Sequence, residues 1–95
     1  MFSIDYDKEL NLITLAGNLD SSRSDEAKSI FQLVQESVTV DMSNLEFICS
    51  SGIGTLVMAY SQLKAIGKSI SFVNLKPHIR KVFEVSLLHK IFDIN

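Results

Sequence analysis

Apolar and polar residues alternate near the start of the chain in a pattern that is typical of strands. Phe2, Ile4 and Tyr6 are separated by single polar residues, as in a half-buried strand. The more continuously apolar stretch LNLITLAG, residues 10–17, predicts a second strand. Because the polar connection between them is short, we expect these two strands to pair in antiparallel fashion.

Further along, apolar residues recur every three or four positions, which is the spacing of a buried helical stripe. Three such sets are Ala27, Ile30, Phe31 and Val34; Ile53, Leu56, Val57, Tyr60 and Leu63; and Ile79, Val82, Phe83 and Leu87. Gly67 is well placed to end the second helix, and Pro77 fits the first turn of the third. The pattern therefore predicts three helices.

Strands are predicted between and after these helices, in SVTVDM (37–42), KSISFVNL (68–75) and KIFDIN (90–95). In the first of them, Val38, Val40 and Met42 share one face. The order β-β-α-β-α-β-α-β predicts an α/β fold with a mostly parallel sheet and one antiparallel N-terminal strand. Partners and ligands favour the carboxyl ends of parallel strands. Two predicted loops stand there, AGNLDSS (16–22) and SNLEFICSS (43–51).

Composition narrows the possible functions. With 95 residues, of which 46% are hydrophobic and 21% charged, we expect one globular domain over residues 1–95. A net charge of −2 without a basic stripe argues against a nucleic-acid partner. There is no apolar run of membrane-spanning length, no signal-peptide pattern and only one cysteine. We therefore expect no direct membrane insertion and a cytoplasmic location. No Cys/His cluster has metal-ligand spacing, so we expect no metal.

The segment NLEFICSSGIGTL, residues 44–56, gathers most of the chemistry in the chain. Cys49 precedes a helix, where a thiolate is stabilised. A cysteine-phosphatase loop would need an arginine where Thr55 stands, however, and no pattern ties His78 or His89 to Cys49. We therefore expect a small buried thiol and no catalytic residue. The glycines lack the lysine of a P-loop and the third glycine of a dinucleotide fingerprint, so they match neither nucleotide-binding motif.

Ser50 and Ser51 stand where this loop meets the helix. One of them is expected to cap the helix, which leaves the other hydroxyl free for solvent or a partner. Phosphate on an exposed serine here would add about −1.5 to −2 charges. The unpaired N–H groups of the helix would be able to bind that charge. The residues alone are therefore compatible with a phosphorylation switch.

A longer pattern carries a resemblance to a known family. VDMSNLEFICSSGIGTLVMAYSQLKAIGKSISFVNLKPHIRKVFEVSLLHKIFDI, residues 40–94, resembles the STAS domains of bacterial anti-sigma factor antagonists. The shared features run from a strand ending in Asp, through a Ser-Ser-Gly and an apolar helix, to a Gly-Lys turn and a Pro-led helix. LAGNLDSSRSDEAK, residues 15–28, resembles the family's Gly-x-Leu/Ile-Asp loop.

The resemblance implies a binding module and not an enzyme. Such proteins bind an ATP-dependent serine kinase that also acts as an anti-sigma factor. The kinase phosphorylates the serine that corresponds to Ser50, which weakens binding, and a metal-dependent serine phosphatase restores it. ATP belongs to the kinase, so the resemblance implies no cofactor. On this chain the docking surface would comprise Asp20, Ser50, Ser51, Gly52 and Ile53.

One departure from the family pattern keeps two other hypotheses in view. Cys49 stands where the family has an Asp, and a thiol orients a neighbouring hydroxyl poorly. The first alternative is therefore a STAS scaffold subunit of a stress-signalling or lipid-transport complex, without phosphorylation. The second is a thiol redox sensor at Cys49, which requires an exposed, acidic thiol. Many relatives also continue into a further helix beyond the position of Asn95, so we expect one side of the sheet to be less covered.

Overall fold

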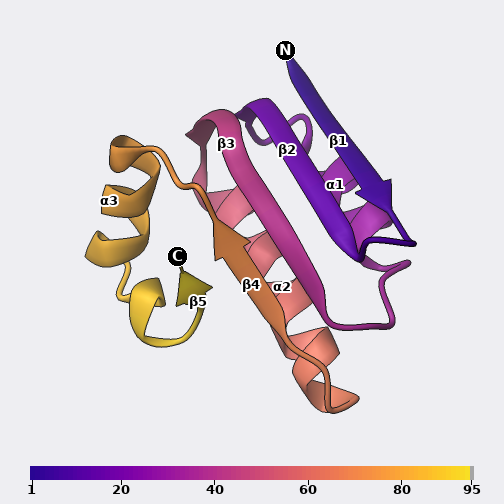
Figure 1. The fold of residues 1–95 in the computed structure, drawn as a ribbon. Helices are drawn as coiled ribbons and strands as arrows, with labels where there is room; N and C mark the ends of the chain where they lie inside the picture. Colours follow the sequence, from indigo (N-terminus) through magenta and orange to yellow (C-terminus); the bar gives the residue numbers. More distant parts are fainter. Residues whose placement is uncertain (95) are drawn as a thin grey trace.

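The structure, a computed structural model, describes residues 1–94 and confirms the predicted α/β fold class. Its elements are β1 (Phe2–Asp7), β2 (Leu12–Leu19), α1 (Ser24–Phe31), β3 (Val38–Ile48), α2 (Ser50–Ala65), β4 (Ile70–Val73), α3 (Pro77–Val85), the 3₁₀ turn η1 (Leu88–Lys90) and β5 (Asp93–Ile94). The strands form one sheet in the order β1-β2-β3-β4-β5. Only β1 is antiparallel to its neighbour, as expected from its short connection to β2 (Figure 1).

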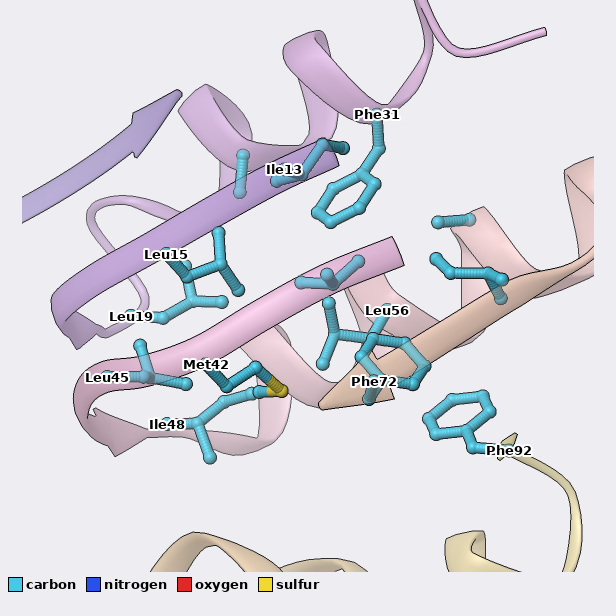
Figure 2. Close-up of a cluster of buried hydrophobic side chains, with 14 of the residues drawn as sticks. Ile13, Leu15, Leu19, Phe31, Met42, Leu45, Ile48, Leu56, Phe72 and Phe92 are labelled. Atoms are coloured by element: carbon cyan, nitrogen blue, oxygen red, sulfur yellow. The ribbon is translucent and has the colours of Figure 1, made fainter. Parts of the chain in front are cut away.

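The core lies on the face of the sheet that carries the helices. In Figure 1, α1 and α2 lie behind the central strands. Figure 2 shows buried side chains of β2 and β3 gathered with Phe31 of α1 and Leu56 of α2. Val38, Val40 and Met42 of β3 are all buried, which confirms their predicted shared face.

The predicted buried stripe of α2 is wrong in part, because the helix begins at Ser50 and presents a different face to the sheet. Its buried residues are Gly52, Thr55, Leu56, Ala59 and Leu63. Three of these are small, which lets the helix lie close to the strands. Ile53 is only half-buried and Val57 is 37% exposed. The helix therefore carries apolar residues on its outer side as well.

An aromatic cluster holds the C-terminal part of the chain against β4. The ring of Phe72 lies 5.9 Å from that of Phe83 in α3 and 4.8 Å from that of Phe92, measured between centroids. Leu87 was expected to point inward but is 58% exposed. The reason is that α3 ends at Val85 and the chain turns at Leu87, whose φ is 61°, so that Leu88 is buried in its place.

Candidate functional site

The two predicted loops meet at the carboxyl end of the parallel strands. The prediction of a loop over residues 43–51 is wrong in part, because β3 continues to Ile48. Two register shifts in its pairing with β2 allow this extension, and they bring Ile48 opposite Leu19. The Cys49 N–H then donates to the Leu19 carbonyl oxygen over 3.0 Å. The segments that follow β2 and β3 are thus tied together where each strand ends.

Gly52 brings the first turn of α2 directly onto the end of β2. A Cβ at this position would lie 2.9 Å from Leu19 Cγ and 3.0 Å from the Leu19 carbonyl oxygen. Both separations are too short for any larger residue without movement. Gly52 is itself buried. It therefore positions the first turn of α2 from within the fold, and its role in partner binding stays a prediction.

Neither serine caps the helix, contrary to the prediction. The N-cap residue of α2 is Cys49, with φ −95° and ψ 176°, and its side chain makes no capping hydrogen bond. Ser50 and Ser51 lie in the first turn. The Ile53 N–H donates to the Cys49 carbonyl oxygen over 3.0 Å. Within residues 1–94, the three N–H groups between these residues donate no backbone hydrogen bond, although those of Ser51 and Gly52 lie near the Cys49 sulfur, so this helix end is able to stabilise an anion.

The two serines differ in what their hydroxyls contact, although both residues are exposed. Ser51 Oγ lies 3.1 Å from Cys49 Sγ and 2.9 Å from Ser24 Oγ. Ser50 Oγ forms no side-chain hydrogen bond with any residue in the described part of the chain. Of the two hydroxyls, that of Ser50 is the one that is both accessible and free.

Cys49 was expected to be buried, but it is only half-buried. Its partial burial alone would raise the pKa of the thiol. The Ser51 hydroxyl and the N–H groups of Gly52 and Ser51 act in the opposite direction and hold the pKa of Cys49 below its usual value. Accessibility and a lowered pKa are the two properties that the redox-sensor hypothesis requires, and that hypothesis stays a prediction.

Asp20 shapes the turn that precedes α1. Its Oδ1 accepts hydrogen bonds from the Ser22 hydroxyl at 2.7 Å and the Ser22 N–H at 3.1 Å. The hydroxyl bond from Ser22 is the main reason that the pKa of Asp20 lies below its usual value. The carbonyl oxygen of Asp20 accepts from Arg23 N–H and Ser24 Oγ. Asp20 thus has a structural role in addition to any contact with a partner.

An apolar surface beside Ser50 was missed from the sequence. Ser50, Ile53 and Val57 stand at i, i+3 and i+7 of α2, so they share one face of the helix. Phe47, near the end of β3, is 49% exposed. The signal was present in the sequence, because Leu56, Val57 and Met58 are consecutive apolar residues, and a helix cannot direct all three to one face. More apolar residues surround this helix than one buried face can use.

A cleft of about 260 Å³ opens between α1 and α2. It is lined by Ser24, Asp25, Lys28, Ser51, Gly54, Thr55 and Met58.

Among residues 1–94, no three His, Cys, Asp or Glu side chains gather closely enough to hold a metal ion. In the same part of the chain, no helix combines the length and apolarity needed to cross a bilayer.

The sequence profile of a family described as "Mlab, STAS domain" matches residues 3–93. The chain belongs to the STAS domain family. Among its relatives is BtrV of Bordetella bronchiseptica, assigned as an anti-sigma factor antagonist. This STAS domain is 33% identical to BtrV over 57 residues, which are 60% of this chain and 49% of BtrV. The chain thus spans about half the length of that relative. The anti-sigma F factor antagonist of Paenibacillus polymyxa is 24% identical over 96 residues, covering 96% of this chain and 82% of that protein.

Solved structures share the same fold. SpoIIAA, an anti-sigma factor antagonist solved in its unphosphorylated form, gives a TM-score of 0.79 at 20% identity and covers 100% of this STAS domain and 88% of its own chain. The Bacillus cell fate determinant SpoIIAA in its phosphorylated form gives 0.71 at 22% identity, covering 100% and 91%. At these identities the likeness establishes the arrangement of helices and strands.

Proposed function

We propose that this STAS domain is an anti-sigma factor antagonist of a bacterial partner-switching network. It binds a serine kinase that also acts as an anti-sigma factor, and phosphorylation of Ser50 by that kinase releases it. The observation that carries the proposal is the Ser50 hydroxyl, which is exposed and unbonded in the first turn of α2. The names of the relatives support the same role, and SpoIIAA is a protein that exists in a phosphorylated form.

The surroundings of Ser50 suit a docking surface. Ile53 and Val57 follow it along one face of α2, and Phe47 is exposed at the end of β3. Exposed apolar side chains grouped around polar ones are typical of protein interfaces. Ser51 and Asp20 border this surface, whereas Gly52 supports it from beneath. Binding therefore combines apolar contact with the polar groups of the two joined loops.

A phosphate on Ser50 would alter this surface in two ways. It would carry about −1.5 to −2 charges, and the free N–H groups of the first helical turn would stabilise it within the domain. It would also place a bulky, strongly hydrated group on the face of α2 that carries Ile53 and Val57. A docked partner would have to desolvate that charge, so affinity falls. A metal-dependent serine phosphatase in the same cytoplasmic network would reverse the change.

Incubation with ATP and a serine kinase encoded beside this gene would test the proposal directly. We expect intact-mass measurement to show one added phosphate on the wild-type protein and none on Ser50→Ala. An active kinase that leaves the wild-type protein unmodified would contradict the regulated function.

A binding measurement tests the release step. We expect Ser50→Asp to weaken binding of the kinase at least tenfold, which corresponds to about 1.4 kcal/mol. Ser61→Asp is the matched control, because Ser61 is an exposed serine of the same helix about three turns away. It should bind like the wild-type protein. Equal affinities for the two variants would remove Ser50 from the interface.

A second candidate function is a constitutive scaffold subunit of a stress-signalling or lipid-transport complex. The observation that favours it is Cys49, which stands directly before Ser50 where the family carries a carboxylate. A neutral thiol neither accepts a proton nor attracts a cationic kinase group as a carboxylate does. A scaffold subunit would co-purify stably with large partners, take no phosphate and be indifferent to Ser50→Ala.

A further inference from the structure

Ser50 and Ser51 are neighbouring hydroxyls, but only Ser51 belongs to a chain of side-chain hydrogen bonds. Its Oγ lies 3.1 Å from Cys49 Sγ and 2.9 Å from Ser24 Oγ. Ser24 Oγ in turn donates to the Asp20 carbonyl oxygen over 3.0 Å. Ser24 is only 9% exposed. Its hydroxyl is therefore shielded from a partner, while Ser51 stands at the surface beside Ser50.

The direction of this chain follows from counting protons. A serine hydroxyl has a single proton to donate. Ser24 gives its proton to the Asp20 carbonyl oxygen, so Ser51 must be the donor in the 2.9 Å contact with Ser24. The neutral thiol of Cys49 then donates to the Ser51 oxygen. Both the proton and an acceptor site of the Ser51 hydroxyl are occupied within the domain.

We propose that the Ser24 hydroxyl determines which serine is phosphorylated, because it holds Ser51 in this chain and leaves Ser50 as the acceptor. The inference rests on the proposed function, namely phosphorylation by a partner kinase. Ser24 is a positioning residue, since it contacts Ser51 and not the phosphate donor. Two adjacent serines in one helical turn are thereby made chemically unequal.

Phosphoryl transfer requires a free hydroxyl oxygen and a transferable proton, and both groups of Ser51 are already in hydrogen bonds. The acceptor oxygen attacks the γ-phosphorus of ATP held by the kinase, and an O–P bond forms as the bond to ADP breaks. The hydroxyl proton passes to a base of the kinase. Ser50 is able to present its oxygen and proton at once. Ser51 would first have to break its bonds to Ser24 and Cys49, and its proton points into the domain.

A gain of phosphorylation provides the test. In Ser50→Ala the preferred acceptor is absent, and we expect no phosphate after incubation with the neighbouring-gene kinase and ATP. In Ser50→Ala/Ser24→Ala, the Ser51 hydroxyl loses its acceptor and is free to rotate. We expect an added phosphate on this double variant, localised to Ser51 by peptide fragmentation. Ser50→Ala/Ser24→Thr keeps a hydroxyl at position 24 and should stay unmodified.

The outcomes separate this inference from the proposed function. If the wild-type protein carries phosphate on Ser50 but the double alanine variant takes none on Ser51, the role of Ser24 is overturned and the proposed function stands. Equal phosphorylation of the Ser24→Ala and Ser24→Thr double variants would also overturn it, because the hydroxyl would then be irrelevant. A wild-type protein that takes no phosphate overturns both proposals together.

Discussion

The two ends of α2 differ in how the unpaired backbone groups of the helix are satisfied. At its C-terminal end the helix is closed by its own backbone: the N–H groups of Gly67 and Lys68 donate to the carbonyl oxygens of Lys64 and Leu63, over 3.1 and 2.8 Å. This pair of backbone hydrogen bonds, together with Gly67 at φ 75°, is a Schellman motif. At the N-terminal end, no side chain caps the helix.

This difference indicates that the polar groups available to a partner lie at the N-terminal end of α2. Lys68 adds an ion pair with Glu36 at 3.0 Å, so the C-terminal end is also closed by side chains. The N-terminal end instead presents free N–H groups, the unbonded hydroxyl of Ser50 and a partly exposed thiol, all next to the close packing of Gly52 on Leu19. The closed end contributes stability, and the open end is suited to binding.

The largest effect on stability is expected at Gly52. In Gly52→Ala the new Cβ meets Leu19 Cγ and the Leu19 backbone oxygen at 2.9 and 3.0 Å, so the first turn of α2 must shift. We expect a loss of about 1–3 kcal/mol in the free energy of unfolding. Gly54→Ala is the matched control, because its Cβ would meet no atom within 4 Å. It should gain about 0.5–1 kcal/mol. Urea denaturation measures both, and a neutral Gly52→Ala would refute the close packing.

Gly67→Ala tests the closed end of the helix. A Cβ there meets no atom within 4 Å, so any cost comes from the left-handed backbone at φ 75°. We expect a loss of about 1–2 kcal/mol in the free energy of unfolding. Gly67→Asn should lose less, since Asn tolerates this conformation. Binding of the kinase should be unchanged in both variants, in contrast to Gly52→Ala. Weakened kinase binding by folded Gly67→Ala would contradict the separation of the two ends.

Most of the fold was predictable from the sequence, because periodicity reports burial. The alternation around Phe2 and Val40 and the placement of Gly67 and Pro77 each matched the structure. The register shifts that extend β3 to Ile48 were not predictable, since they arise from pairing with β2 and have no local pattern. The order of the strands in the sheet was not predictable from the sequence either.

The site was predictable in outline and not in detail. Sequence alone brought the segments around Asp20 and Ser50 to one end of the sheet. It did not reveal that Cys49 is the N-cap residue, because two serines beside it are better capping residues. It also gave no sign of the contact between Ser51 and Ser24, which are 27 positions apart. Such contacts depend on how two helices pack and not on local propensity.

Cys49→Asp would close the open end of α2. The backbone at Cys49 already has the extended conformation of an N-cap residue, so a carboxylate there is able to accept from the free N–H groups of the first turn. We expect about 1 kcal/mol of added stability relative to Cys49→Ala in urea denaturation. If the carboxylate also orients Ser50, phosphorylation by the kinase should become faster. A variant no more stable than Cys49→Ala would show that these N–H groups are not available.

The smallest effect we expect is a pH dependence confined to the open end. Because the folded protein lowers the pKa of Cys49, its thiolate stabilises the fold above the unfolded-state pKa. That contribution is lost as the pH falls through the folded-state pKa. From about pH 7 to about pH 9.5, a span that brackets the usual thiol pKa, wild-type stability should therefore rise relative to Cys49→Ala. Gly67→Ala, at the other end of α2, should keep this slope. Urea midpoints that change in parallel for wild type and Cys49→Ala would rule out a lowered pKa at Cys49.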